Sequence, residues 1–482
     1  MTTAWPFGYP PGSYTNASMT TYPVYPISVG PNPTDAAGMV ARLEGYLAAD
    51  RDRLRAYDAY YEGEQPLRYM APALERELDG RILQLVLNWP RLGADAYENR
   101  LDVEGFRFKG ESSGDENLWA VWQANNCDEQ SQQAHLESLI LSRSYVIIGA
   151  GDAEDDPPII SVESPFQVAT IRDARTRRVV QALKRWDEDD GSRWATLYLP
   201  DSTTMLVYEK GTWRSVGVDR HGMGRVPVVP LVNRPRLLRP NGVSETHDIL
   251  PIADAANKMA TDMMVSGEFH AMPRRWAFGL KEDDFVNEAG EPISTWTAIA
   301  GRLWSSENEN VRVGQFDEAD LAVFHNTIKL LAQVCSQQLA LPPHYLAFNS
   351  DNPASADAIR SSEVQLVKRV ERKHTYLGGA WEDVARFVLR VQTGGWDKEA
   401  QHLETVWRDP STPTVAQKAD AVMKLVSGGI IPVEQARIDL GYTDLQRLDM
   451  AQMDAAAAAD PTLERIARDL AGPGSGASAI GG

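Results

Sequence analysis

Cysteine is scarce in this sequence: Cys127 and Cys335 are its two thiols among 482 residues. They cannot form a disulfide framework or the paired knuckles of a zinc site. No apolar run approaches the ~20 residues that a bilayer-spanning helix needs. The first residues are rich in Pro, Tyr, Ser and Thr and lack the basic and then apolar order of a secretory signal. We therefore expect a cytoplasmic, reducing setting and no membrane contact.

Positive charge is also in short supply, with 48 Lys and Arg against 67 Asp and Glu and a formal net charge of −19. Neutralised phosphates supply most non-specific affinity for nucleic acid, so a protein that grips DNA usually carries a basic excess. The charge balance excludes a tight DNA-binding protein. It leaves a protein unrelated to nucleic acid, or one that touches nucleic acid without holding it.

Nucleotide-binding signatures are missing as well. No G-x-x-x-x-G-K-[ST] phosphate loop occurs, which excludes a P-loop motor. An expected strand at 145–148 runs into Gly149 and Gly151, the opening of a dinucleotide-binding turn. Glu154 stands where the third glycine is required, and the residues after it cannot begin the necessary helix. A simple strand and turn is the favoured interpretation.

Metal-binding and catalytic patterns are equally weak. None of the eight histidines pairs at the i, i+4 spacing that presents two zinc ligands from one helix. Acidic clusters at 152–156 and 187–190 could bind a divalent cation. Both clusters lie at expected hairpin turns, where solvated carboxylates are the simpler explanation. We predict no catalytic residue, no metal and no cofactor.

The first half of the chain shows mixed periodicity. Residues 1–34 have no sustained period and predict an extended or disordered arm. Apolar residues at helical spacing predict a helix over 34–62, and a capping Asn88 with Pro90 in the first turn predicts another over 88–100. From 145 to 232, short β-rich runs alternate with turn residues. The fold class is therefore α+β, with a substantial antiparallel sheet.

The second half is mainly helical. Apolar spacing predicts helices over 242–270 and 319–339, and Pro342 and Pro343 stop the second helix. The insert between them is expected to contain short strands at 275–278, 296–304 and 311–316. A long helix follows Pro353 and reaches about 391, roughly 60 Å if straight. The remaining expected elements are an extended segment at 404–407 and helices at 415–427, 432–440 and 444–459.

Several stretches point to a lineage rather than to a reaction. They are NWP at 88–90, RLDVEGF at 100–106, residues 245–268, LPPHY at 341–345, DNPASADAIR at 351–360 and WRDP at 407–410. With the order of elements, these stretches resemble the portal proteins of tailed bacteriophages, especially the siphophage type found in phages of actinobacteria. The resemblance covers about 34–453.

The resemblance implies an architecture of named parts: a wing, a stem helix pair, a β-containing clip, a long tunnel helix and a helical crown. Their expected bounds are 1–34 for the arm, 35–241 for the wing, 242–270 and 319–340 for the stem helices, 271–318 for the clip, 341–353 for the tunnel loop, 354–393 for the tunnel helix, 394–413 for a return segment of the wing, 414–456 for the crown and 457–482 for a flexible tail.

The resemblance also implies a function without catalysis. Portals of this family are rings of twelve subunits at one capsid vertex, through which double-stranded DNA passes during packaging and ejection. The implied partners are the terminase, a head–tail adaptor, and the major capsid and scaffolding proteins. The implied location is the virion, after assembly in the host cytoplasm. Two alternatives stay open: a soluble acidic metal-dependent hydrolase using 152–156, and another ring-forming head–tail connector, although such connectors are typically much shorter.

The DNA channel is the first site that the resemblance implies. Polar residues without fixed positive charge in the tunnel loop would touch DNA weakly: His344, Tyr345, Asn349, Ser350 and Asp351. Cations of the tunnel helix come next: Arg360, Lys368 and Arg372, with Arg369 and Lys373 nearby. The alternative for these cations, slightly favoured, is ion pairing with Glu363 and Glu371 or between subunits. An acidic ring would centre DNA by repulsion over a Debye length of ~8–10 Å.

The clip is the second implied site, as the docking surface for the packaging motor and head-completion proteins. Trp276, Trp296 and Trp304 lie in a segment too small to bury all three rings. Packing between neighbouring clips in a ring is the favoured interpretation. A partner-facing hot spot is the alternative.

Overall fold

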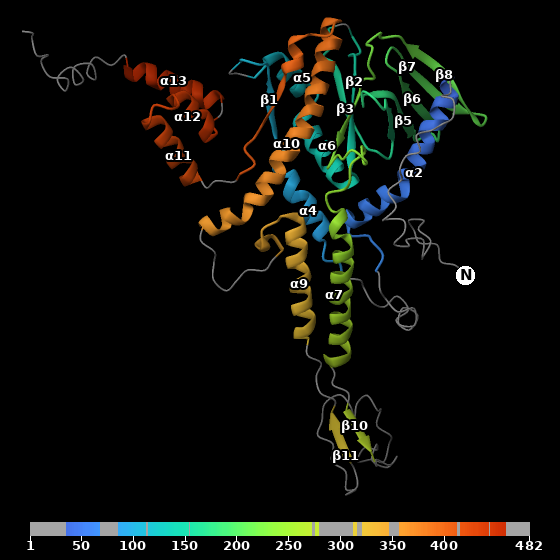
Figure 1. Cartoon of the computed structure of the whole chain (residues 1–482), viewed down its shortest axis with the longest axis vertical. Helices are drawn as coiled ribbons and strands as arrows, with labels where there is room; N and C mark the ends of the chain where they lie inside the picture. Colours follow the sequence, from blue (N-terminus) through green and yellow to red (C-terminus); the bar gives the residue numbers. More distant parts are fainter. Residues whose placement is uncertain are drawn as a thin grey trace, which may run out of the picture. The chain divides into compact units, whose positions relative to one another are not determined.

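The computed structural model describes residues 35–67, 85–111, 114–153, 155–271, 275–278, 312–315, 321–346, 356–411, 415–442 and 444–458. The chain divides into two units, Met1–Pro410 and Ser411–Gly482, and each is treated by itself below. The α+β class is confirmed, because helices and antiparallel strands interleave along the first unit (Figure 1). The predicted arm at 1–34 lies outside the described residues.

A five-stranded antiparallel meander forms one side of the first unit. Its strands are β4 (Val168–Arg172), β5 (Val179–Asp187), β6 (Arg193–Tyr198), β7 (Thr203–Glu209) and β8 (Thr212–Asp219). Helix α2 (Ala36–Glu62) begins at Asp35, whose carboxylate accepts a hydrogen bond from Gly38 N at 3.0 Å. Val40 and Leu43 of α2 pack against Leu183 and Leu197 of the sheet. The helical spacing recognised in the sequence is thus the stripe that covers this sheet.

A three-stranded sheet of order β3-β2-β9 forms the centre of the unit. It comprises β2 (Arg143–Gly149), β3 (Ile159–Glu163) and β9 (Val228–Val232). β2 and β3 are antiparallel, with Gly149 opposite Ile159. Gly149 therefore ends a strand and Gly151 lies in the connection to an antiparallel neighbour, as the simple interpretation predicted. A dinucleotide-binding turn would have required a crossover helix.

Five further elements complete this part of the unit. Helices α4 (Trp89–Glu98), α5 (Glu116–Ala124) and α6 (Cys127–Leu141) contribute to the largest apolar core, and β1 (Val103–Arg107) pairs with β12 (Glu404–Trp407). Asn88 caps α4 as expected, its side chain accepting from Arg91 N at 3.4 Å. The β1–β12 pair joins segments 300 positions apart, so the chain after the long helix returns into the body of the unit.

Two helices, α7 (Leu250–Ala271) and α9 (Ala322–Leu339), extend side by side from the body (Figure 1). The sequence predicted a helix from 242, but regular helix begins at Leu250, after the 3-10 turn η1 (His247–Ile249). The residues in between are held as extended chain, because Val243 N donates to Asn233 O and Glu245 N to Leu139 O. Gly242 has φ 70°, and a Cβ there would lie 2.1 Å from Asn233 O.

Between the two helices in the sequence, the described residues include one short antiparallel pair of strands. Strand β10 (Arg275–Phe278) pairs antiparallel with β11 (Arg312–Gln315). Both were expected, at 275–278 and 311–316. The third expected strand, 296–304, lies outside the described residues.

The long helix α10 (Ala356–Thr393) has 38 residues, about 57 Å at 1.5 Å per residue. It lies along the central sheet and buries Leu366, Val370, Leu377 and Trp381 in the main core. Contact with the body along most of its length stabilises a helix that would be marginal alone. After α10, the 3-10 helix η4 (Glu399–His402) precedes β12.

The second unit consists of α11 (Val415–Ser427), α12 (Val433–Leu440) and α13 (Asp444–Ala458). Its three helices match the expected ranges within one residue at each end. Arg437 of α12 pairs with Asp454 of α13 and holds these two helices together. Among the described helices, none is both long and apolar enough to cross a membrane.

Candidate functional site

The connection between α9 and α10 begins as a tight turn. Ala340 adopts φ 53° and ends α9, with Leu341 N donating to Ser336 O at 2.9 Å. Two prolines then prevent further α-helix, and η3 (Pro343–Leu346) follows. Leu341 and Leu346 are buried in the main core. The first half of the predicted tunnel loop is therefore anchored to the body.

His344 and Tyr345 differ in their exposure and in their contacts. Tyr345 is half-buried, and its hydroxyl accepts from Arg100 Nη2 at 2.7 Å and donates to Glu363 Oε1 at 3.4 Å. Arg100 also pairs with Glu363 at 3.5 Å. Tyr345 thus connects the loop to the segment after α4, through Arg100, and to α10, through Glu363. His344 is exposed. The other predicted loop residues, Asn349, Ser350 and Asp351, lie outside the described residues.

The cations of α10 fall into distinct environments. Lys368 pairs with Glu371 at 2.6 Å on the exposed face of the helix, which matches the intrahelical alternative. Arg369 donates to Gln338 O at 2.8 Å, where it caps the end of α9. Arg372 is exposed, and within the described part of the chain no carboxylate lies within ion-pair distance of it. Arg360 belongs to α10, but its side chain is outside the described residues.

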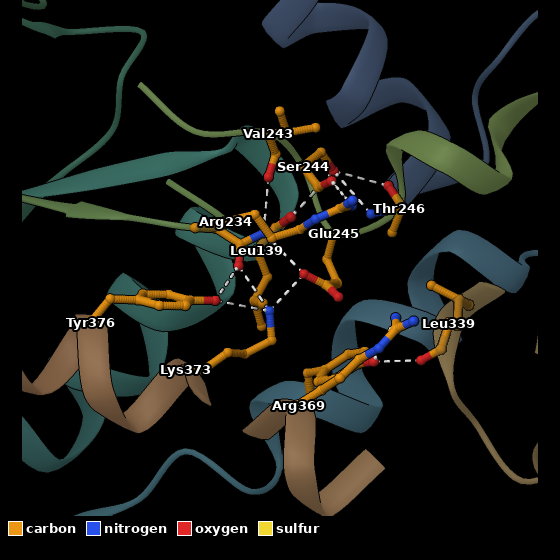
Figure 2. A network of polar contacts seen from close by, with 12 residues as sticks. Leu139, Arg234, Val243, Ser244, Glu245, Thr246, Leu339, Arg369, Lys373 and Tyr376 are labelled. Carbon is orange, nitrogen blue, oxygen red and sulfur yellow. Dashed lines mark hydrogen bonds and ion pairs between the residues drawn. The ribbon is translucent and has the colours of Figure 1, made fainter. Parts of the chain in front are cut away.

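Lys373 is buried rather than exposed on α10, and its ion-pair partner is Glu245 rather than the expected Glu363 or Glu371. Its side chain is 2% exposed, and its Nζ lies 2.6 Å from Glu245 Oε2 and donates to Asn233 Oδ1 at 2.8 Å. Tyr376 OH donates to the same Asn233 oxygen at 3.2 Å. Figure 2 shows these side chains converging from α10, the segment after β9 and the segment before α7. This cluster, defined by Lys373, Glu245, Asn233 and Tyr376, is called the polar joint below.

The charges of the polar joint stabilise one another. Burial alone would raise the pKa of Glu245, but the ammonium of Lys373, the nearby Arg234 and the Asn233 amide hold this pKa below its ordinary value. Burial lowers the pKa of Lys373, and Glu245 opposes that shift. A buried charge is tolerated when it is paired and its remaining donors are hydrogen-bonded. The 2.6 Å contact with Glu245 and the hydrogen bonds to Asn233 and Tyr376 give the buried ammonium of Lys373 the partners that such a charge requires.

The polar joint sits where three elements meet. Glu245 precedes α7, Tyr97 OH donates to Leu339 O at the end of α9, and Lys373 Nζ lies 4.7 Å from the centre of the Tyr97 ring. The segment before the start of α7 is thereby bound directly to α10, and the end of α9 is connected to α10 through Tyr97. No short-range signal in the sequence could have found this site, since Lys373 and Glu245 are 128 positions apart.

The helix pair carries a second feature that the sequence patterns missed. Large apolar side chains remain exposed on it and at the start of α10: Met264, Val323, Leu330 and Val364, each between 55% and 62% exposed. Ala256, on the apolar stripe of α7, is instead fully buried within the subunit. Met264, Val323 and Leu330 lie off the apolar stripes that periodicity identified on the two helices, and an apolar residue off a stripe was the available signal. Val364 was instead one of the apolar positions from which the long helix was predicted, and the structure leaves it exposed.

The predicted clip and acidic turns can be placed in part. Trp276 belongs to β10, opposite Gly314, but its side chain is not described, and Trp296 and Trp304 lie outside the described residues. In the acidic turns, Asp156 Oδ2 accepts from Ala153 N at 2.9 Å and Asp190 Oδ1 from Ser192 N at 2.8 Å. These two carboxylates close the turns in which they lie.

Comparison with known proteins identifies the family of the chain. A model of the phage portal protein family of the SPP1 Gp6-like type matches residues 42–459. The portal protein of Mycobacterium phage D29 is 36% identical over 413 residues, covering 83% of this chain and 85% of the relative. The portal protein of Mycobacterium phage L5 is 36% identical over 424 residues, covering 86% and 87%.

Similar solved structures include the neck of a native gene transfer agent particle computed with C12 symmetry, with a TM-score of 0.43 and 13% identity over 73% of this chain and 88% of that one. The neck of the empty particle computed with C6 symmetry has a TM-score of 0.45 and 12% identity over 79% and 96%. The sequence matches define a structural protein of the bacteriophage particle. The chain belongs to the phage portal protein family of the SPP1 Gp6-like type.

Proposed function

We propose that twelve copies of this chain close into a ring at one capsid vertex and that double-stranded DNA passes through it during packaging and ejection. In this proposal α7 and α9 form the stem, residues 271–318 the clip, residues 341–353 the tunnel loop, α10 the tunnel helix and residues 414–456 the crown. The terminase and later a head–tail adaptor dock at the clip, and major capsid and scaffolding proteins surround the ring.

The observation that carries the proposal is the set of exposed apolar side chains on the helix pair. Met264, Val323 and Leu330 are each more than half exposed on helices that project from the body. We infer that these side chains contribute to contacts between subunits, where apolar surface of a projecting element is removed from water. Burying the exposed part of one such side chain against a neighbour contributes about 1–2 kcal/mol, and a closed ring repeats this contact at every interface.

The net charge of −19 supports passage rather than capture of DNA. Each phosphate neutralised by a fixed cation would add sequence-independent affinity and slow sliding. Among the cations described on α10, Lys368 is paired, Arg369 caps α9 and Lys373 is buried. Arg372 and the exposed His344 are left for transient contacts with the backbone of DNA.

Electron microscopy and mass determination of the purified protein test the ring. We expect closed rings with a central channel. Leu330→Asp should lower the yield of rings strongly. His325→Asp also adds an aspartate at an exposed position of α9, but on a side of the helix about 140° away from Leu330, and should leave the yield unchanged. A wild-type protein that stays monomeric at every salt and protein concentration would contradict the proposal.

A further inference from the structure

An arginine-rich cleft opens between the β4–β5 turn, β9 and the second half of α10. Its volume is about 770 Å³, within the range of sites that enclose a ligand or a short peptide segment. Five guanidinium groups line it, in a chain whose net charge is strongly negative: Arg172, Arg177, Arg178, Arg225 and Arg386.

Most of the cations of this arginine cleft are poorly compensated. Asp383 is the one carboxylate among the lining residues, and Arg386 holds it at 2.8 Å and also pairs with Glu382 at 3.1 Å, so Arg386 is itself compensated. Arg225 lies over the ring of Trp396, 4.4 Å from its centre. Within the described part of the chain, neither Arg178 nor Arg225 has a carboxylate within ion-pair distance. The Nε of Arg172 is buried and makes no hydrogen bond to any described residue. Such an arrangement is stabilised when an anion binds.

The pKa values report the same mutual repulsion. Burial lowers the pKa of Arg225, and the neighbouring guanidinium groups of Arg178 and Arg386 lower it further, against the opposing effect of Asp383. Burial and Arg143 lower the pKa of Arg172. Arginine stays protonated in proteins. The lowered pKa values therefore indicate that the positive charges of Arg172 and Arg225 lie in an unfavourable electrostatic environment, which a bound anion would improve.

The shape and walls of the cleft favour a peptide over DNA. Valine and proline side chains of the β9 region line it beside the arginines, including Val226, Val229 and Pro230. A duplex presents a line of phosphates on a convex surface, one charge per ~1.7 Å of axis, and is bound by extended basic surfaces. An acidic loop that inserts into a concave, partly apolar site fits the arginine cleft better.

The same sheet offers such a loop at its opposite end. The β5–β6 turn carries four consecutive exposed acids, Asp187, Glu188, Asp189 and Asp190. Hydrogen bonds from Ser192 lower the pKa of Asp190 and keep it ionised. β5 has nine residues, so about 30 Å separates this acidic turn from the arginine cleft beside the start of β5. One subunit therefore carries complementary charges at the two ends of one hairpin.

A closed ring needs contacts of this asymmetric kind, because each cyclic interface joins two different surfaces of the same chain. We propose that the acidic turn 187–190 of one subunit inserts into the arginine cleft of the next subunit and sets the spacing between their bodies. The inference rests on the proposed ring and adds to it a specific pair of surfaces.

A charge exchange tests the contact. Arg178→Asp and Asp189→Arg change exposed side chains to which the structure assigns no ion pair or hydrogen bond. Each alone should weaken subunit association roughly tenfold to a hundredfold, since like charges then meet at the interface. The double variant should recover most of the loss. Lys109→Asp, the same change in charge in an exposed turn after β1, is the control and should have no effect.

The measurement is the fraction of protein in rings, by mass photometry or sedimentation, over increasing NaCl concentration. As a second readout, the Arg178→Cys, Asp189→Cys double variant should form a ladder of oxidised multimers that neither single variant forms. The native Cys127 and Cys335 are buried and should not contribute.

The outcomes separate the two proposals. If the wild-type protein forms no rings, the proposed function fails. If rings form but the charge exchange restores nothing and the cysteine pair does not crosslink, this inference alone is wrong. It is equally wrong if Arg178→Asp leaves the rings intact but abolishes binding of a double-stranded oligonucleotide, because the cleft would then be a nucleic-acid site.

Discussion

Replacing Lys373 by methionine tests the role of the polar joint most directly. Methionine has a similar length and a similar helix propensity to lysine, so the backbone of α10 should tolerate it. The substitution removes the ammonium that lies 2.6 Å from Glu245 Oε2 and 2.8 Å from Asn233 Oδ1. The Glu245 carboxylate would stay buried, with Asn233 and the more distant Arg234 as compensation.

The expected loss follows from the burial of both partners, which are 2% and 4% exposed. Breaking a buried pair by removing one partner costs about 3–5 kcal/mol of unfolding free energy. Lys368→Met is the matched control, because Lys368 lies on the same helix and its pair with Glu371 is 69% and 47% exposed. An exposed pair contributes about 0–1 kcal/mol, so the control should lose little.

Urea unfolding followed by tryptophan fluorescence measures this difference, since Trp381 is buried on α10 in the main core. A Lys373→Met, Glu245→Leu double variant should recover part of the loss, because no uncompensated charge remains buried. If Lys373→Met proves as stable as Lys368→Met, the pair does not hold α10 to the segment before α7. If the double variant is less stable than Lys373→Met, the uncompensated charge is not the cause of the loss.

Three further predictions concern other parts of the chain. Burial lowers the pKa of His135 to about 3 from an ordinary 6.5; the unfolded chain therefore takes up a proton that the folded chain does not, and stability should fall by about 1.4 kcal/mol per pH unit between pH 6.5 and 3. His135→Gln should flatten this slope in unfolding curves, and an unchanged slope would exclude His135 as its source. Gly242→Ala should lower the yield of folded protein, because its Cβ would meet Asn233 O at 2.1 Å; normal yield and melting temperature would contradict this. Replacing residues 348–351 by glycine should leave rings intact but reduce packaged DNA in a complementation assay, and unchanged packaging would contradict the tunnel-loop assignment.

The elements of the fold were largely predictable because local signals determine them. Asn88 before Pro90 marked the start of α4, and the range 404–407 was recovered as β12 without error. The α7 boundary shows where local signals end. Apolar spacing continued back to 242, yet the backbone of Val243 and Glu245 bonds to Asn233 and Leu139 instead. Those partners are distant in sequence, and tertiary contacts overrode the periodic pattern there.

The candidate site was less predictable for the same reason. The sequence shows which residues of α10 are cationic, but not which face of α10 is covered. Lys368 and Lys373 are five positions apart, on different sides of the helix, and one is exposed while the other is enclosed by Glu245 and Tyr376. Distinguishing them required the position of the segment before α7, which only the folded chain supplies.

The distribution of positive charge suits a protein that must pass DNA without binding it. On α10, Lys373 is neutralised inside the body and Lys368 on the helix surface, so neither offers a fixed charge to a passing phosphate. The uncompensated arginines gather instead in a cleft of the body, where the acidic turn 187–190 of a neighbour is the proposed counter-charge. In this arrangement these arginines lie at the interfaces between subunits. In the channel, the same cations would slow the passage of DNA. The charge exchange at Arg178 and Asp189 therefore also tests whether part of the positive charge of this acidic chain, which has 48 basic residues, serves contacts between subunits.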